Sequence, residues 1–266
     1  MFAVVYTGVL KRRGFFKKLK RAVGRPRPFV ERIDYDGSFY YRVLTDCDAE
    51  RTDWQNIARL CGKCARNLLL PSETALPPDC GCARFDSSRY EQELLTEAAV
   101  SVIEQAAKAG KKLTLGLVDI PANQPRLVVR LLEYAETVRV LTARVDEYDR
   151  YAESVYRRLG VAPVVGGDAA VLDSCSAVLA PQGFEGIGSF SVGGVIFAPR
   201  THGCIEVVRE SISLPQGTAV PDKIEPFDFA AACWQLMGKS DYIRLPVMLG
   251  IHGGAPIDTN ALAQKI

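Results

Sequence analysis

The most constraining feature of the sequence is a regular alternation of apolar, β-rich runs and amphipathic helical patterns between residues 112 and 199. Their order is strand, helix, strand, helix, strand, strand, strand. The segments are LTLGLVDI (113–120), PRLVVRLLEYA (125–135), TVRVLT (137–142), VDEYDRYAESVYRRLG (145–160), APVVGG (162–167), SCSAVLAP (174–181) and GGVIFAP (193–199). Strands that alternate with helices form a parallel sheet covered by the helices. The pattern therefore predicts that the strands at 113–120, 137–142 and 162–166 are parallel neighbours.

The two helices of this region have apolar stripes at helical spacing, and these stripes should face the sheet. The side chains that we expect to be buried are Leu127, Val128, Leu131 and Leu132 in the first helix and Tyr148, Tyr151, Val155 and Tyr156 in the second. A sheet covered in this way is the doubly wound, Rossmann-like architecture.

The first 110 residues follow a different pattern. Residues 2–7 are typical of a strand, and the runs 29–35 and 38–45 flank Asp36-Gly37, a strong hairpin signal. These three runs predict a small antiparallel sheet. One amphipathic helix should then run from Trp54 to Leu68, and a second should follow with its end at Gly110.

The predicted fold class is therefore α/β, a Rossmann-like parallel sheet with an α+β N-terminal region. The 266 residues divide into an N-terminal region at 1–110 and the α/β domain at 111–266. With 48% hydrophobic and 24% charged residues, the composition is that of an ordinary globular protein. No apolar run approaches the roughly 18–20 residues of a membrane helix, so we expect no membrane and a cytoplasmic protein.

A ligand in such a sheet binds beyond the carboxyl ends of the strands. This rule selects Asp119 and Asn123 after the first strand, Thr142 and Arg144 after the second, and Gly166 after the third. The glycine-rich loop of dinucleotide-binding proteins is absent, because DIPANQP follows the first strand in its place. The free amides at the start of the next helix remain able to receive an anion.

The run VRVLTARVDEYDRYAESVYRRLG resembles the second strand and helix of the NADP-binding domain in shikimate dehydrogenases and glutamyl-tRNA reductases. The resemblance extends over residues 113–200. Those proteins carry an Asn-Arg-Thr turn where this chain has Thr142-Ala143-Arg144, so the resemblance implies that Arg144 would hold the 2′-phosphate of NADP. The sequence departs from that family in lacking the glycine loop and a Lys–Asp catalytic pair.

Two functions remain open from the sequence, which does not decide whether the chain is an enzyme. The missing glycine loop favours a binding or regulatory scaffold that uses no cofactor. Arg144 and the helix that begins at Pro125 favour the alternative, an NADP-dependent oxidoreductase whose catalytic residues are unknown.

Eight cysteines occur, and four of them have a spacing close to that of a zinc ribbon, Cys61-x-x-Cys64 followed by Cys80-x-Cys82. Against a metal site, Cys61 and Cys64 fall on the apolar stripe of the predicted helix. We therefore expect buried, reduced thiols and no zinc, with a metal site or a redox pair as the alternatives.

The segment from Lys11 to Arg27 holds nine basic residues and no acidic residue. Such a segment can bind an acidic partner or nucleic acid, and binding to nucleic acid would weaken steeply with salt. The alternative is a solvated connection between two strands.

Overall fold

The computed structural model describes residues 1–8, 28–184, 187, 190–244, 247–252 and 254–266. The basic segment Lys11–Arg27 lies outside the described residues, so its expected role stays a prediction. The chain forms two compact units. Unit 1 contains residues 1–90 and 213–245, and unit 2 contains residues 91–212 and 246–266. The domain boundaries expected at 1–110 and 111–266 also stay a prediction, because compactness alone does not show which parts fold independently.

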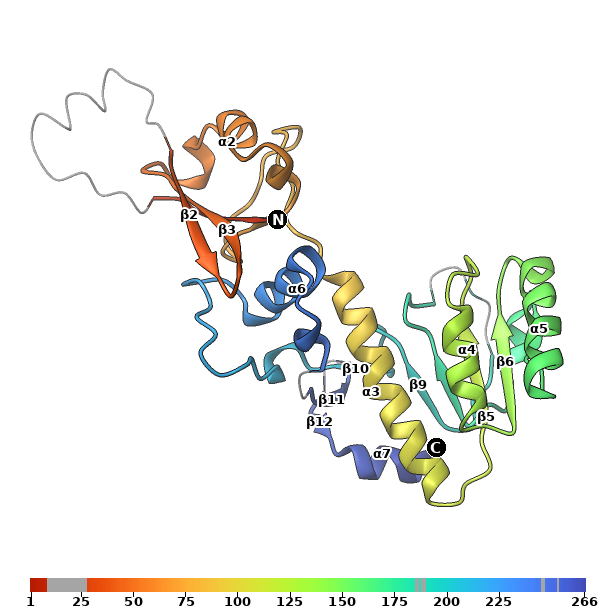
Figure 1. Cartoon of the computed structure of the whole chain (residues 1–266). Coiled ribbons are helices and arrows are strands. Elements are labelled where there is room, and N and C mark those ends of the chain that lie inside the picture. The colour runs from red at the N-terminus through yellow and green to blue at the C-terminus, as the bar shows by residue number, and fades with distance from the viewer. Residues whose placement is uncertain (9–27, 185–186, 188–189, 245–246, 253) are drawn as a thin grey trace, which may run out of the picture. The chain divides into compact units, whose positions relative to one another are not determined.

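Unit 1 is built on a mixed sheet with the strand order β2-β3-β1-β4 (Figure 1). The strands are β1 (Ala3–Tyr6), β2 (Phe29–Tyr35), β3 (Ser38–Leu44) and β4 (Leu68–Leu69). The predicted hairpin is present, since β2 and β3 are antiparallel and both Asp36 and Gly37 have the positive φ of the tight turn.

The expectation of a purely antiparallel sheet is wrong for β1, which pairs parallel to both β3 and β4. All four residues of β1 are buried. Such a strand belongs at the centre of a sheet, and the long connection of residues 7–28 frees it from a tight hairpin with β2.

The helices of unit 1 include α2 (Trp54–Cys61) and α6 (Pro226–Met237), and α3 (Ser88–Lys108) begins in unit 1 and continues into unit 2. The predicted helix from Trp54 to Leu68 is too long, because α2 ends where Gly62 has a φ of +54°. A short 3-10 helix, Gly62–Arg66, follows. None of the helices in the described ranges is long and apolar enough to cross a membrane.

Unit 2 is built on an eight-stranded sheet with the order β12-β11-β10-β9-β8-β5-β6-β7. The strands are β5 (Thr114–Val118), β6 (Thr137–Leu141), β7 (Val164–Gly166), β8 (Ala177–Leu179), β9 (Val195–Phe197), β10 (Ile205–Val207), β11 (Leu249–Ile251) and β12 (Pro256–Ile257). From β5 to β10 all neighbours are parallel. Numbered from β5, their spatial order is 3-2-1-4-5-6, the strand order of the Rossmann fold. The predicted fold class is confirmed.

The helices of unit 2 are α4 (Pro125–Leu132), α5 (Val145–Leu159) and α7 (Thr259–Lys265), together with most of α3 (Figure 1). The expected stripes are mostly correct. The buried residues are Leu127, Val128 and Leu131 in α4 and Tyr148, Ala152 and Val155 in α5.

Three expected core residues are less buried than predicted. Leu132 and Tyr151 are half-buried, and Tyr156 is 59% exposed. The prediction for Tyr156 is wrong because α5 packs beside β7, the last strand of the sheet, and covers it with a narrow stripe.

Gly116 in the middle of β5 is required by close packing. A Cβ atom there would stand 2.9 Å from both Leu172 Cδ2 and Val178 Cγ2. We predict that Gly116→Ala lowers the free energy of unfolding, because overpacking costs about 1–3 kcal/mol. That cost exceeds the roughly 0.5–1 kcal/mol gained when a strand glycine becomes alanine.

Gly167→Ala is the matched control, since its Cβ would make only ordinary contacts, the nearest at 3.6 Å from Val145 Cγ2. It should be neutral or slightly stabilising. Urea unfolding of both variants checks that only Gly116→Ala lowers the free energy of unfolding. An unchanged midpoint for Gly116→Ala would contradict this account of β5.

Candidate functional site

The five residues predicted at the sheet mouth lie together at the carboxyl ends of β5, β6 and β7. Asn123 donates its backbone N–H to Asp119 Oδ1 at 3.1 Å. The amide of Thr142 donates to the carbonyl of Gly166 at 3.0 Å, and the amide of Arg144 donates to Thr142 Oγ1 at 3.1 Å. Whether these residues bind a cofactor stays a prediction.

The carboxylate of Asp119 organises the turn after β5. Its residue is fully buried, and its two oxygens accept the backbone N–H groups of Asn123 and Gln124 at 3.1 and 2.7 Å. The hydroxyl of Tyr148 on α5 also donates to Oδ2. Burial raises the pKa of Tyr148, and the hydrogen bond to Asp119 raises it further. The phenol therefore stays protonated as a permanent donor.

The backbone of this turn closes tightly around the carboxylate. Ala122 has a φ of +57°, and its amide donates to the carbonyl of Asp119 at 3.1 Å. α4 begins immediately afterwards with Pro125 in its first turn. In dinucleotide-binding folds the amides at the start of this helix receive the pyrophosphate. Here the carboxylate of Asp119 already accepts hydrogen bonds from two backbone amides of that turn.

The second turn is tied to the first by Thr142, which is fully buried. Its hydroxyl donates to the carbonyl of Ile120 at 3.2 Å and accepts from the amide of Arg144. The guanidinium of Arg144 is more than half exposed and contacts Glu147 at 3.1 Å. The mouth thus consists of a hydrogen-bonded polar turn with the Arg144 guanidinium on its surface.

Two hollows in the described part of unit 1 were not revealed by the sequence. The larger has a volume of about 610 Å³. It is lined by Tyr6, Thr7, Tyr40, Arg42, Leu44, Asp48, Ala49, Pro71, Glu73, Thr74, Pro221, Asp222 and Lys223. These residues come from segments more than 200 positions apart, so no local motif could have predicted the hollow.

The larger hollow combines tyrosine rings with an excess of acidic groups. Three carboxylates, those of Asp48, Glu73 and Asp222, line it together with two cations, Arg42 and Lys223. Arg42 already has a partner, because its guanidinium forms an ion pair with the carboxylate of Glu31 on the neighbouring strand β2. The charge that remains in the hollow is negative.

The tyrosines of this hollow keep their protons at neutral pH. Burial raises the pKa of Tyr6 to about 12, with smaller contributions from Tyr40 and the negative charge of Asp222. Burial also raises the pKa of Tyr40. Their hydroxyl groups therefore keep a proton to donate and an oxygen that can accept a hydrogen bond.

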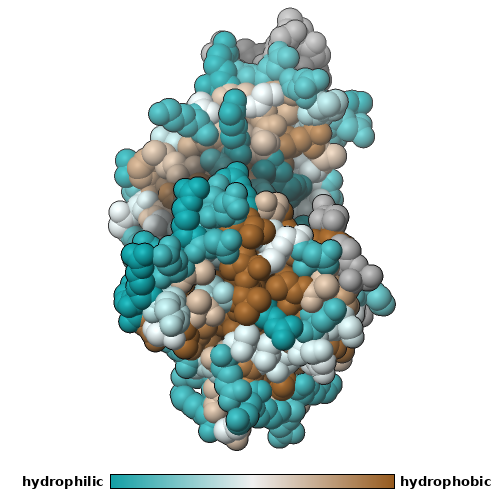
Figure 2. All heavy atoms as spheres, turned by 90° about the vertical axis from the view of Figure 1, so that its right-hand side faces the viewer, coloured by the Kyte–Doolittle hydropathy of each residue, from teal (hydrophilic) through white to brown (hydrophobic). Residues whose placement is uncertain are grey.

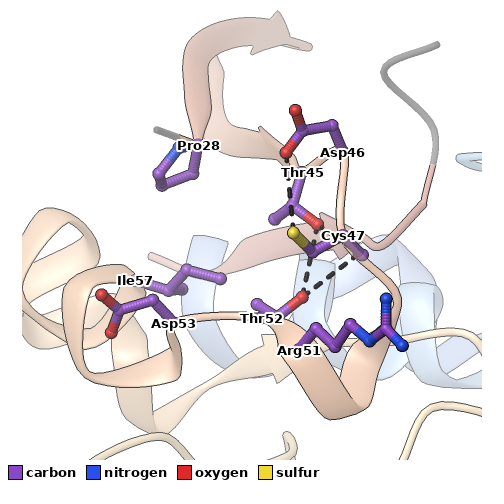
Figure 3. A pocket seen from close by; sticks show the side chains of 8 residues that line it. All are labelled: Pro28, Thr45, Asp46, Cys47, Arg51, Thr52, Asp53 and Ile57. Carbon is purple, nitrogen blue, oxygen red and sulfur yellow. Dashed lines mark hydrogen bonds between the residues drawn. The ribbon is translucent and has the colours of Figure 1, made fainter. Parts of the chain in front are cut away.

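The smaller hollow, of about 310 Å³, lies on the loop that follows β3 (Figure 3). Thr45 Oγ1 donates to the carbonyl of Cys47 at 2.9 Å, and Thr52 Oγ1 donates to the carbonyl of Asp48 at 2.9 Å. These hydroxyls hold the loop itself. Their engagement makes the smaller hollow the weaker candidate for a ligand.

The four cysteines with zinc-ribbon spacing gather in the core of unit 1. Cys61, Cys64 and Cys80 are buried, and Cys82 packs against the same apolar cluster. Burial raises the pKa of Cys61 to about 11 and that of Cys82 to about 12, which disfavours the thiolates that a metal needs. Among the described residues no group of three or more metal-ligating side chains is placed to hold an ion. The absence of zinc stays a prediction.

The role of Asp119 gives a prediction about stability. Tyr148→Phe removes one hydrogen bond to a buried carboxylate and should lower the free energy of unfolding by roughly 1.5–3 kcal/mol. Tyr156→Phe, on the exposed side of the same helix, should change it by less than about 0.5 kcal/mol. Urea unfolding measures both, and equal effects of the two substitutions would show that the Tyr148 hydroxyl does not support the turn.

Comparisons with known proteins do not identify a family for this chain. No family model matches the chain, and no curated protein matches it. Among solved structures the chain is similar to L-tryptophan dehydrogenase from Nostoc punctiforme, with 10% sequence identity and a TM-score of 0.37. The match covers 77% of this chain and 64% of the dehydrogenase chain. This chain therefore spans less than two thirds of the length of the dehydrogenase.

Proposed function

We propose that this protein is a binding or regulatory protein whose Rossmann-like sheet serves as a scaffold and not as a dinucleotide site. The observation that carries the proposal is the buried carboxylate of Asp119, which accepts the amides of Asn123 and Gln124. A pyrophosphate would have to displace this carboxylate or bind beside it.

Both routes are unfavourable for a dinucleotide. Displacing the carboxylate would leave a buried charge without its two amides and the Tyr148 hydroxyl, and a buried charged group that loses its partners costs more than 1–3 kcal/mol, the approximate range for a neutral one. Binding beside the carboxylate would place two negative charges together at low local dielectric. We therefore expect weak or absent binding of NADPH and NADH.

The alternative function is an NADP-dependent oxidoreductase in which Arg144 holds the 2′-phosphate. The observation that favours it is the position of the Arg144 guanidinium, more than half exposed and close to the mouth of the sheet. If this alternative holds, NADPH gains a charge-assisted contact with Arg144 that NADH lacks. Such a contact is worth roughly 1.5–3 kcal/mol, or about ten- to a hundredfold in affinity.

A fluorescence titration of NADPH and NADH separates the two functions. For the native protein we expect no submicromolar binding of either nucleotide. The test variant is Arg144→Ala. The matched control is Arg150→Ala, because Arg150 is an exposed arginine of α5, the helix that follows Arg144. Submicromolar binding would contradict the scaffold. A preference for NADPH that only Arg144→Ala abolishes would establish the alternative.

The place for a ligand in this proposal is the larger hollow of unit 1. Its three carboxylates and the hydroxyl groups of Tyr6 and Tyr40 suit a small organic cation, since the charge attracts an ammonium group and a hydroxyl oxygen can accept its N–H. Burial is the main cause of the raised pKa of Tyr6, and the negative charge of Asp222, which lines the same hollow, adds to it.

Isothermal titration with spermidine and choline as cationic probes, and citrate as an anionic probe, tests this assignment. We expect binding of at least one cation and none of citrate. Asp222→Asn should weaken the cation about tenfold or more, while Asp241→Asn, an exposed acid of the same unit, should not. Preference for citrate, or equal effects of the two substitutions, would contradict the assignment.

A further inference from the structure

β7 is the last strand of the eight-stranded sheet and pairs only with β6 in the part of the chain that the structure describes. Its outer side therefore presents a strand edge. Backbone N–H and C=O groups at such an edge are a template for pairing with another strand. Natural proteins usually protect such an edge with charged side chains or proline.

β7 is short, with three residues, and beyond this its edge carries little protection. The stretch LGVAPVVG (159–166) contains no charged residue, and its single proline, Pro163, removes only one N–H donor. Exposed apolar side chains surround it instead. Tyr156, Leu159, Val161 and Val164 are between 45% and 59% exposed.

These four side chains come from one stretch of nine residues at the end of α5 and the start of β7. Figure 2 views the molecule from the side on which α5 and β6 lie in Figure 1, and shows hydrophobic residues gathered among hydrophilic ones. Single exposed apolar residues are ordinary, whereas a contiguous group indicates an interaction surface.

The charges of α5 indicate which partner fits this surface. Its first turn carries the acids Asp146 and Glu147, and its last turn carries the bases Arg157 and Arg158. If a two-fold axis relates two β7 edges, the two copies of α5 run antiparallel. The acidic first turn of each helix then faces the basic last turn of the other.

We propose that the β7 edge, with Tyr156, Leu159, Val161 and Val164, binds a second copy of this chain. The two β7 strands pair antiparallel about a two-fold axis and join the two parallel sheets. Such an interface is isologous, so one surface must complement itself. The surface would complement itself through backbone pairing of the two β7 strands, through its apolar side chains and through the opposite charges at the two ends of α5. This inference is independent of the ligand proposed above.

Sedimentation velocity of the full chain at about 1–100 µM tests the interface. We expect a dimer that becomes monomeric in Val164→Lys. Met248→Lys is the matched control, because Met248 is also an exposed apolar residue of unit 2. Circular dichroism verifies that both variants remain folded. A monomeric native protein, or a dimer that Val164→Lys leaves unchanged, would overturn the proposal.

Charge reversal tests the antiparallel arrangement. Replacing Arg157 and Arg158 by Glu should weaken the dimer at low salt, because acidic turns then face acidic turns. Adding Asp146→Lys and Glu147→Lys to the same chain should restore it, since the charge pattern is reversed but again complementary. Failure of the combined variant to recover would show that the two helices do not meet in this way.

Discussion

The hydrogen bonds of the Asp119 carboxylate are the interaction on which the sheet mouth of unit 2 depends. It joins the end of β5, the first turn of α4 and, through Tyr148, the buried face of α5. In a nucleotide-binding Rossmann fold these elements meet at a bound phosphate. Here a fixed anion of the protein takes that place, so the turn keeps its shape without any ligand. In the function that we propose, the same fold is retained without a bound dinucleotide.

The parallel sheet could be predicted from the sequence because its signals are local. Strands β5 to β7 are apolar runs of the right length, and the stripes of α4 and α5 repeat at helical spacing. Errors arose where the outcome depended on distant neighbours. Tyr156 has the spacing of a core residue, but β7 is an edge strand and nothing in the described chain covers that side. The length of α2 was overestimated because the conformation of Gly62 was not recognised.

The candidate sites divide in the same way. Asp119, Thr142 and Arg144 were predicted because the rule for parallel sheets places ligands at strand ends. That the Asp119 side chain turns inward could not be predicted, since it depends on the α5 phenol 29 residues away. The hollow of unit 1 was invisible in the sequence because its wall needs residues 221–223, which return to unit 1 only after most of unit 2 has been built.

That return has a consequence for how the protein is made. The Phe229 ring of α6 packs edge-on against Phe2, Tyr35 and Tyr40, with ring centroids 5.4 to 6.1 Å apart. A ribosome synthesises Phe2 more than 220 residues before Phe229. During translation the first sheet must therefore wait with an uncovered aromatic face while residues 91–212 fold. Unit 1 is therefore completed only after residues 91–212 have been synthesised.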